Sequence, residues 1–303
     1  MIKVRDIAFV RFGVPDLDEM ERFTHAFGLV TSERSNEALY SRGTDTSPYV
    51  HVAERGDAGF RGVAFEAASA EDLEAAAKME GASAIEDLDG PGGGRRVRFS
   101  DPDGFPVELV HGRATVEPLP VFKPLPLNRG GDVQRRGVRQ RLQRGPAQVK
   151  RIGHCVLVVS DFAKSEAWYK SRFGFLDSDR VYLGDPEKLI SSFMRCDRGD
   201  EFVDHHTFLC VELGEPGFEH VAFEVEDFDA VMLGHDHLKE AGYEHHMGVG
   251  RHIAGSQIFD YWRDPWGHSH EHFTDGDLLN AGAEAQLVDP QTVLGTWWGG
   301  MAR

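Results

Sequence analysis

Two histidines and a glutamate in the second half of the chain have the clearest potential for chemistry. They are His154, His220 and Glu271, and each lies in a short run that is typical of a strand. Two neutral imidazoles and one carboxylate on one face of a metal ion leave the opposite coordination positions free, as in non-haem Fe(II) oxygenases. Nitrogen and oxygen ligands without a thiolate suit Fe(II) or Mn(II), although Zn(II) and Ni(II) also accept them. The sequence therefore predicts a metal centre at these residues.

An internal repeat singles out the same three residues. The aligned segments are 6–17 with 151–162, 62–66 with 220–224, and 101–108 with 264–271. At the positions equivalent to the three ligands, the first half carries Phe9, Gly62 and Glu108. Only the second half can therefore chelate a metal, provided that its strands curl around a common cavity.

The elements that must position these residues are predicted from the same repeat. In each half a strand runs into a helix that starts at an aspartate and ends at Phe-Gly, and a later strand leads into a second, acidic helix start. An Asp-Pro turn then leads into the last strand. Each half therefore contains a strand-helix-strands unit twice, which predicts an α+β fold with an internal duplication. Because side chains on a strand alternate between faces, His154 should share one face with Val156.

The length of 303 residues fits two domains. We predict an N-terminal domain without metal at 1–116, a linker at 117–149, a catalytic domain at 150–280 and a tail at 281–303. The linker is rich first in proline and then in arginine, which favours a solvated segment or a contact between subunits. The tail contains Trp297 and Trp298, which could dock on a neighbour or cap the domain.

The amino-acid composition limits which binding partners and which cellular compartment we expect. A net charge of −17 argues against binding to nucleic acid, whose phosphates would be repelled. No apolar stretch approaches the roughly 18 residues of a membrane span, and no signal peptide is recognisable. The cysteines Cys155, Cys196 and Cys210 form no CxxC pair, which favours reduced, buried thiols. We therefore expect a soluble, cytoplasmic protein whose partner is a small molecule rather than nucleic acid or a membrane.

A family resemblance rests mainly on the end of the second half. Gly250-Arg251-His252 is followed by Tyr261-Trp262-Arg263-Asp264-Pro265-Trp266-Gly267-His268-Ser269-His270-Glu271, which is similar to the signature G-x-H, then Y-x-x-[DENTA]-P-x-G and a closing glutamate. Over roughly residues 5–280 the chain resembles the vicinal oxygen chelate superfamily and, within it, the two-domain type I extradiol dioxygenases. One departure is Asp260, where the family usually has an apolar residue. The resemblance implies two domains, each a pair of βαβββ modules that form an incomplete barrel.

The resemblance also implies roles for individual residues. It implies that His154, His220 and Glu271 are the metal ligands, and that a histidine of the pair His205-His206, together with His252 and Tyr261, is catalytic. An imidazole titrates near neutral pH, so it can serve as the acid and base of the reaction. We prefer His206 for this role and expect His205 on the outer face of the same strand, although strand alternation leaves open which of the two points inward. His252 and Tyr261 would hydrogen-bond a substrate oxygen.

The activity that the resemblance implies is meta cleavage of a catechol-type aromatic diol by O2 at an Fe(II) site, with Mn(II) as the other metal, in a homo-oligomer. Met247 stands where relatives that act on carboxylated catechols have an arginine, which favours a neutral substrate. Two alternatives remain. A glyoxalase-like isomerase or lyase of the same fold would need no pair of His252 and Tyr261, and a non-catalytic small-molecule-binding protein would be purified without metal. The other histidines of the second half are expected to be exposed or hydrogen-bonded in the ordinary way; they are His235, His237, His245, His246, His268, His270 and His272.

Overall fold

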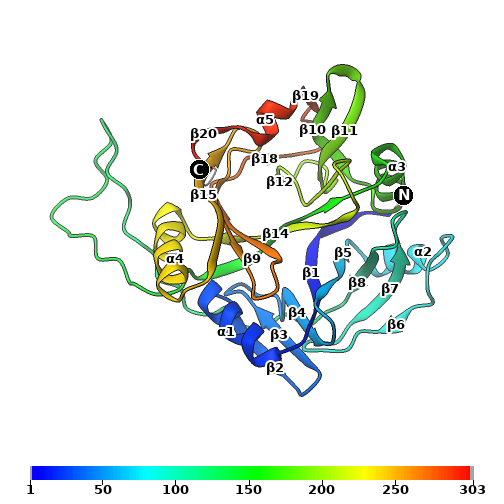
Figure 1. The fold of residues 1–303 in the computed structure, drawn as a ribbon, viewed down its shortest axis with the longest axis horizontal. Helices are drawn as coiled ribbons and strands as arrows, with labels where there is room; N and C mark the ends of the chain where they lie inside the picture. Colours follow the sequence, from blue (N-terminus) through cyan, green and yellow to red (C-terminus); the bar gives the residue numbers. More distant parts are fainter. Residues whose placement is uncertain (1, 301–303) are drawn as a thin grey trace.

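The computed structural model describes residues 2–300 and contains two large β-sheets with few helices (Figure 1). The first sheet consists of β1 (Val4–Val14), β2 (Val30–Arg34), β3 (Ala38–Arg42), β4 (His51–Arg55), β5 (Gly59–Ala67), β6 (Glu86–Asp87), β7 (Arg95–Ser100) and β8 (Pro106–His111). The second consists of β9 (Val149–Val158), β10 (Leu176–Leu183), β11 (Asp185–Arg195), β13 (Phe208–Val211), β14 (Gly217–Val225), β15 (Glu244–His252), β16 (Ile258–Arg263), β17 (Ser269–Thr274), β19 (Gln286–Val288) and β20 (Thr296–Gly299). Two short strands, β12 (Val203–Asp204) and β18 (Leu278–Leu279), pair with each other. The helices are α1 (Leu17–Phe27), α2 (Ala70–Ala76), α3 (Phe162–Phe173), α4 (Phe228–Glu240) and α5 (Pro290–Leu294).

The order of the strands repeats between the halves. The first sheet runs β2-β3-β4-β1-β5-β8-β7-β6, and the second runs β10-β11-β13-β9-β14-β17-β16-β15 between its two added edge strands. Each half is therefore a strand, a helix and three strands, twice over, and the two copies meet at the antiparallel pairs β1/β5 and β9/β14. The predicted α+β fold of paired βαβββ modules is confirmed.

The helix ends follow the residues that predicted them. Asp16 accepts hydrogen bonds from the backbone of the first turn of α1, and Asp161 does the same for α3. Both helices end at a glycine with positive φ, which is Gly28 for α1 and Gly174 for α3. A Cβ atom at Gly28 would lie 1.6 Å from the carbonyl oxygen of Ala147, so this turn also needs glycine for the close approach of the linker's end.

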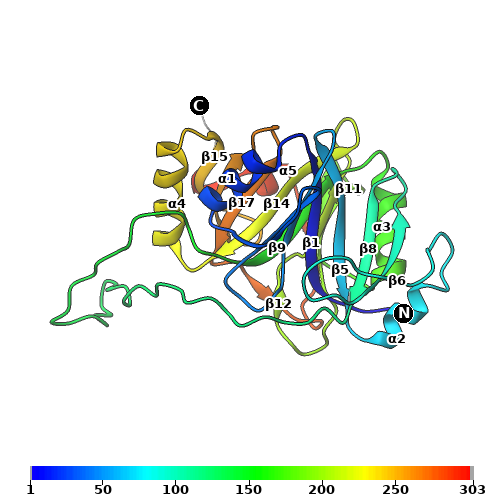
Figure 2. The ribbon, with the colours of Figure 1, turned by 90° about the horizontal axis from the view of Figure 1, so that it is seen from below.

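The two halves share one continuous hydrophobic core. Helix α1 of the first half lies beside α4 (Figures 1 and 2). The ring of Phe27 in α1 stacks on His272 of β17 with centroids 3.9 Å apart. Conversely, the second half contributes α3 to the contact, and Phe173 of this helix packs against Phe65 of the first sheet. Each half therefore supplies a helix that covers apolar surface of the other, and burial of that surface stabilises the pair together.

Between β8 and β9 the chain forms no helix or strand apart from an isolated bridge between Arg129 and Asp132. This segment extends away from the body of the molecule and returns to it at β9 (Figures 1 and 2). It contains all but the last residue of the predicted linker, since Val149 begins β9. The boundaries of the linker and of the two domains stay predictions.

The tail covers both edges of the second sheet. Strand β19 pairs with β10 at one edge, α5 follows, and β20 pairs with β15 at the other edge. Trp298 lies opposite Arg251 in this last pair. Pairing of edge strands removes backbone groups that would otherwise be free for another chain. The strand that carries the Trp pair thus caps an edge of the sheet, while the side chains of Trp297 and Trp298 remain exposed. Among the described residues, the helices all fall short of the length and apolarity that crossing a membrane requires.

Candidate metal centre and active site

Three neighbouring strands bring the predicted ligands together. His154 comes from β9, His220 from β14 and Glu271 from β17, and Ala222 of β14 pairs with both His154 and Glu271. His220 is two residues before Ala222, so it lies on the same face. The Nε2 atoms of the histidines are 3.1 Å apart, and Oε2 of Glu271 lies 3.2 Å from His154 Nε2 and 3.3 Å from His220 Nε2.

The chemistry of this trio fits a bound cation. All three side chains are buried, and both carboxylate oxygens of Glu271 have no hydrogen-bond partner in the described part of the chain. Burying an unpaired carboxylate is costly, and two imidazole Nε2 atoms that face each other need a proton or a cation between them. Burial lowers the pKa of His154 below its ordinary value, so the neutral form that binds metals is favoured. A divalent ion between the three residues would satisfy every one of these atoms.

A carboxylate that strand alternation did not predict supports His220. Glu219 contacts Nδ1 of His220 through its Oε2 atom. A bulge between Phe218 and His220 breaks the alternation at this point, so neighbouring residues can meet. Burial would lower the pKa of His220, but the Glu219 and Glu271 carboxylates outweigh it and raise the pKa to about 10. A carboxylate on the far nitrogen of a metal-bound histidine fixes the ring and increases its basicity.

His205 and His206 lie side by side behind the trio. The ring of His206 lies 4.0 Å from that of His154, whereas His205 contacts Asp179 at 3.1 Å through its Nε2 atom. The two histidines also touch, with their Nδ1 atoms 3.2 Å apart. The prediction that they point to opposite faces of one strand was wrong, because β12 ends at Asp204 and both rings are buried together. Burial and the neighbouring imidazoles lower the pKa of His206 well below its ordinary value.

His252 and Tyr261 form the other side of the site. His252 Nε2 lies 3.2 Å from the Tyr261 hydroxyl and 3.9 Å from Oε1 of Glu271. The imidazole of His252 stacks on Phe259 with centroids 3.9 Å apart, which sets its tilt. Burial, partly opposed by Glu271, lowers the pKa of His252 to about 4. Tyr261 and Glu271 pair directly across β16 and β17, so the hydroxyl and the carboxylate share the inner face.

An apolar wall borders these polar groups. Its buried members are Val156, Val181, Ile190, Phe193, Leu209 and Ala254, and Val288 and Val293 of the tail pack against them. Val156 follows His154 by two residues on β9, as predicted, and Phe193 packs edge-on against His206 with centroids 5.0 Å apart. The site therefore combines a polar cluster with a surface suited to an aromatic ring.

Residues 151–271 match a family model described as the Glyoxalase/Bleomycin resistance protein/Dioxygenase superfamily. The matched range begins just before His154 and ends at Glu271, so it contains the whole trio. Over these residues the chain is similar to the members of that superfamily.

Several known proteins resemble nearly the whole chain. Metapyrocatechase 2 of Cupriavidus necator is 29% identical over 283 residues, which cover 92% of this chain and 83% of that protein. The Mn(II)-bound glyoxalase from Novosphingobium aromaticivorans has a TM-score of 0.79 at 24% identity, covering 100% of this chain and 93% of that one. Homoprotocatechuate 2,3-dioxygenase from Brevibacterium fuscum, in its anaerobic complex with 3,4-dihydroxyphenylacetate, has a TM-score of 0.78 at 21% identity, covering 98% and 89%. The solved structures show that the vicinal oxygen chelate fold is shared.

In the first half, arginine side chains pair with the carboxylate that is equivalent to Glu271. Glu108 is buried at the position equivalent to Glu271, and its Oε1 accepts a hydrogen bond from Arg11 Nε at 2.5 Å. Arg96 Nη1 lies 3.2 Å from the other oxygen, Oε2. The guanidinium of Arg11 also lies over the ring of Phe9, 4.9 Å from its centroid. The carboxylate is thus paired within the chain.

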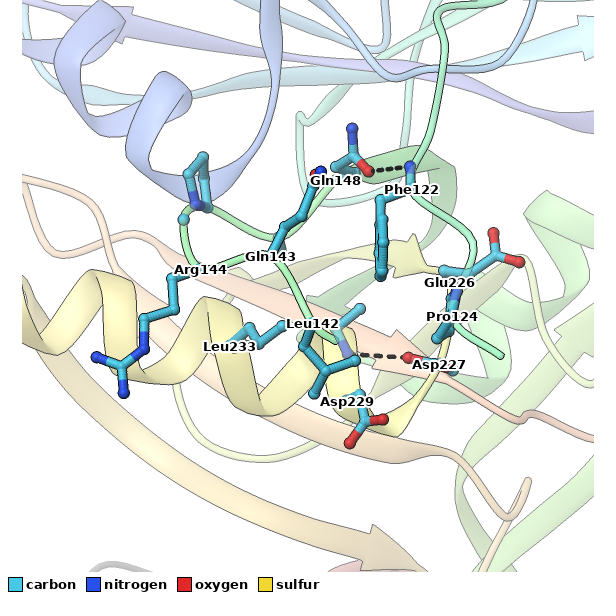
Figure 3. Close-up of a pocket in the computed structure, with 14 residues that line it drawn as sticks. Phe122, Pro124, Leu142, Gln143, Arg144, Gln148, Glu226, Asp227, Asp229 and Leu233 are labelled. Atoms are coloured by element: carbon cyan, nitrogen blue, oxygen red, sulfur yellow. Dashed lines mark hydrogen bonds between the residues drawn. The ribbon is translucent and has the colours of Figure 1, made fainter. Parts of the chain in front are cut away.

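A separate cavity of about 240 Å³ lies between the linker and the first turns of α4 (Figure 3). Its rim includes Phe122, whose backbone N–H donates to Gln148 Oε1 at 2.7 Å, and Leu233 of α4. The lining contains no histidine and none of the predicted site residues. It is therefore distinct from the metal centre.

Proposed function

We propose that the chain is an extradiol ring-cleaving dioxygenase that inserts O2 into a catechol-type diol by meta cleavage, of the catechol 2,3 type. The observation that carries this proposal is the convergence of a buried two-histidine, one-carboxylate trio with His206, His252 and Tyr261. The similarity to metapyrocatechase 2 and to homoprotocatechuate 2,3-dioxygenase supports it.

The proposed ligands are His154, His220 and Glu271, and the proposed metal is Fe(II), with Mn(II) as the alternative. When bound, such an ion would supply adjacent open positions for the two diol oxygens and for O2. The Mn(II)-bound neighbour supports a divalent ion with this ligand chemistry.

The remaining polar residues act on the substrate and its protons. The Tyr261 hydroxyl and His252 Nε2 bind one diol oxygen and stabilise the negative charge that grows on it. His206 is neutral at pH 7 because of its lowered pKa, and its Nδ1 is engaged by His205. Its Nε2 is therefore the atom that takes up the substrate proton and returns it later.

The proposed substrate is a neutral catechol. Met247 pairs directly with Tyr261 across β15 and β16, so its apolar side chain lies on the same face as the Tyr261 hydroxyl. Relatives that act on carboxylated catechols have an arginine near this position. Together with the apolar wall, this favours a ring with alkyl or aryl substituents over one with a carboxylate.

The main competing function is a glyoxalase-like isomerase or lyase. The Mn(II)-bound glyoxalase has the same fold, so the fold alone does not separate the two activities. The substitution His252→Phe discriminates them, because only ring cleavage uses this imidazole. We expect it to reduce ring cleavage by about 100-fold or more. Retention of full activity toward a glutathione hemithioacetal would favour the competing function.

The decisive experiment is anaerobic purification, loading with Fe(II) and addition of a panel of catechols in the presence of O2. We expect a yellow ring-opened product and uptake of one O2 per ring cleaved. Protein that binds iron stoichiometrically but leaves every catechol intact would contradict the proposal. Protein that binds no metal at all would favour a non-catalytic binding protein. Homo-oligomer formation and a cytoplasmic location also stay predictions, and gel filtration tests the first.

A further inference from the structure

A second cluster of metal-binding side chains lies on the opposite face of the same sheet. His235 is on α4, His245 on β15 and Asp260 on β16. His245 Nε2 lies 2.8 Å from Asp260 Oδ1, and His235 Nδ1 lies 3.3 Å from the same oxygen. Asp260 precedes Tyr261 on the strand, so its side chain points away from the metal centre and toward α4. The departure of Asp260 from the family pattern thus concerns this outer face rather than the substrate cavity.

The repeat shows that this face is ordinarily apolar. Asp260 lies opposite His272 across β16 and β17, and the equivalent pair in the first half is Val97 opposite Leu109. Both of these are fully buried. A carboxylate and an imidazole have therefore replaced two apolar side chains at a core position, where burying them costs free energy unless they are fully paired. Nδ1 of His272 is itself buried without a hydrogen-bond partner among the described residues.

The surroundings of Asp260 resemble those of a metal-bound carboxylate. Asp260 is completely buried, and its Oδ2 accepts a hydrogen bond from Trp262 Nε1 at 2.6 Å. This bond orients the carboxylate. Oδ1 then faces His245, and His235 Nδ1 lies almost equally far from the two oxygens, 3.3 Å from Oδ1 and 3.2 Å from Oδ2. The rings of His235 and His245 are nearly perpendicular, with centroids 4.9 Å apart, so they approach the carboxylate from different directions. One carboxylate oxygen and two ring nitrogens, with Trp262 fixing the carboxylate, supply three of the four ligands that a tetrahedral site needs.

We propose that His235 Nδ1, His245 Nε2 and Asp260 Oδ1 hold a divalent transition-metal ion, with zinc as the ion to test. Imidazole and carboxylate donors suit this class of ion, and a fourth position is left for water. His235 and His245 remain partly exposed, which gives the ion a route from solvent. The site is separate from the trio around Glu271, and the inference does not depend on the proposed dioxygenase activity.

The ion would join elements that carry catalytic residues. It would connect α4 to the antiparallel pair β15 and β16, which supply His252 and Tyr261. Its role is therefore to stabilise the outer side of the active site rather than to take part in the reaction.

Zinc stoichiometry tests the proposal. Full-length wild type and the variants His235→Gln, His245→Gln and His237→Gln are saturated with zinc chloride, desalted and analysed by mass spectrometry. His237 lies on the same helix outside the cluster, so it is the matched control. We expect His235→Gln and His245→Gln each to hold one equivalent of zinc per chain less than wild type and His237→Gln. Equal zinc content in all four proteins would overturn the proposal.

A measurement on wild type avoids any effect of the variants on folding. Crystals soaked in zinc chloride should give an anomalous peak within about 2.0–2.2 Å of the three named ligand atoms. Zinc-free density, with both histidines donating hydrogen bonds to Asp260, would instead identify the cluster as a network without metal and overturn the proposal.

Discussion

At the scale of single residues, the charge of Glu271 depends on its two histidine neighbours. Burial alone would raise its pKa, yet contact with His154 and His220 lowers it far below the ordinary value. The carboxylate is therefore charged in a site closed to solvent, which requires positive charge beside it.

The substitution Glu271→Gln removes this charge while keeping the shape. We expect iron content to fall at least tenfold and ring cleavage to fall at least about 100-fold, because one of three ligands is lost. Iron analysis after anaerobic loading measures the first effect, and oxygen uptake measures the second. Glu108→Gln, at the equivalent position of the first half, is the matched control and should retain iron. Equal iron loss in both variants would show that a fold defect, not a lost ligand, is responsible.

His206 and His205 can be separated by paired substitutions. We expect His206→Asn to lower kcat by about 10²–10⁴-fold while iron content stays unchanged, as for loss of a general acid and base. His205→Asn should have a smaller effect, because His205 acts on the site only through His206. Steady-state rates normalised to iron content test this. A larger loss of kcat in His205→Asn would reverse the assignment.

At the level of elements, the sequence predicted the features that follow from strand periodicity and helix caps. It missed the features that depend on irregular backbone. The repeat identified β9, β14 and β17 and hence the three residues that converge as proposed ligands, because alternation along regular strands determines which way each side chain points. It failed for His205, which lies beyond the end of β12, and for Glu219, which lies in a bulge. The outer cluster was also missed, since His235 comes from a helix whose distance from the sheet no local pattern reveals. The expectation that His235 and His245 are hydrogen-bonded in the ordinary way agrees with the structure, but the sequence did not identify Asp260 as their common partner.

Close approach of α4 to the sheet depends on Gly234. A Cβ atom there would lie 2.7 Å from Cβ of Ala147 and 3.3 Å from the His272 ring. Alanine favours helices over glycine by about 1 kcal/mol, but here we expect the clash to win and Gly234→Ala to be destabilising by about 1–3 kcal/mol. Urea denaturation measures the change. Met232→Ala, at an exposed position of the same helix, should be nearly neutral, and a stabilised Gly234→Ala variant would show that the helix can shift at no cost.

At the scale of the whole molecule, the two halves share one hydrophobic core. Packing of one half on the other is therefore part of folding. His51 of β4 is fully buried there, and its Nε2 lies 3.3 Å from His270 Nε2. Burial first, and then the neighbouring His270, lowers the pKa of His51 well below its ordinary value, and burial lowers that of His270 to about 4. Both histidines are therefore neutral in the folded protein at pH 7.

Because folding lowers these pKa values, we expect acid to destabilise the packing of the two halves against each other. The unfolded chain binds more protons than the folded one below pH 6.5, so this contribution to stability is complete above that pH and declines as pH falls toward 4. One pKa unit corresponds to about 1.4 kcal/mol. Replacing His51 with leucine removes one such group, so we expect the unfolding free energy of His51→Leu to decrease less between pH 7.5 and 5 than that of wild type.

Urea unfolding at several pH values measures this dependence, and His237→Leu, where the side chain is partly exposed, is the control. Identical slopes for wild type and His51→Leu would mean that His51 is not the titrating group.

The ion pair of Arg11 with Glu108 has a consequence for any attempt to build a second iron centre in the first half. Installing histidines at positions 9 and 62 would not suffice, because the guanidinium already neutralises the carboxylate and a side chain at Gly62 would meet the Pro106 carbonyl oxygen at 2.6 Å. Because this guanidinium belongs to the chain itself, it neutralises the Glu108 carboxylate without a bound metal ion. If the proposed function holds, iron starvation or a chelator should therefore inactivate the second half, while the first half keeps its native charge balance.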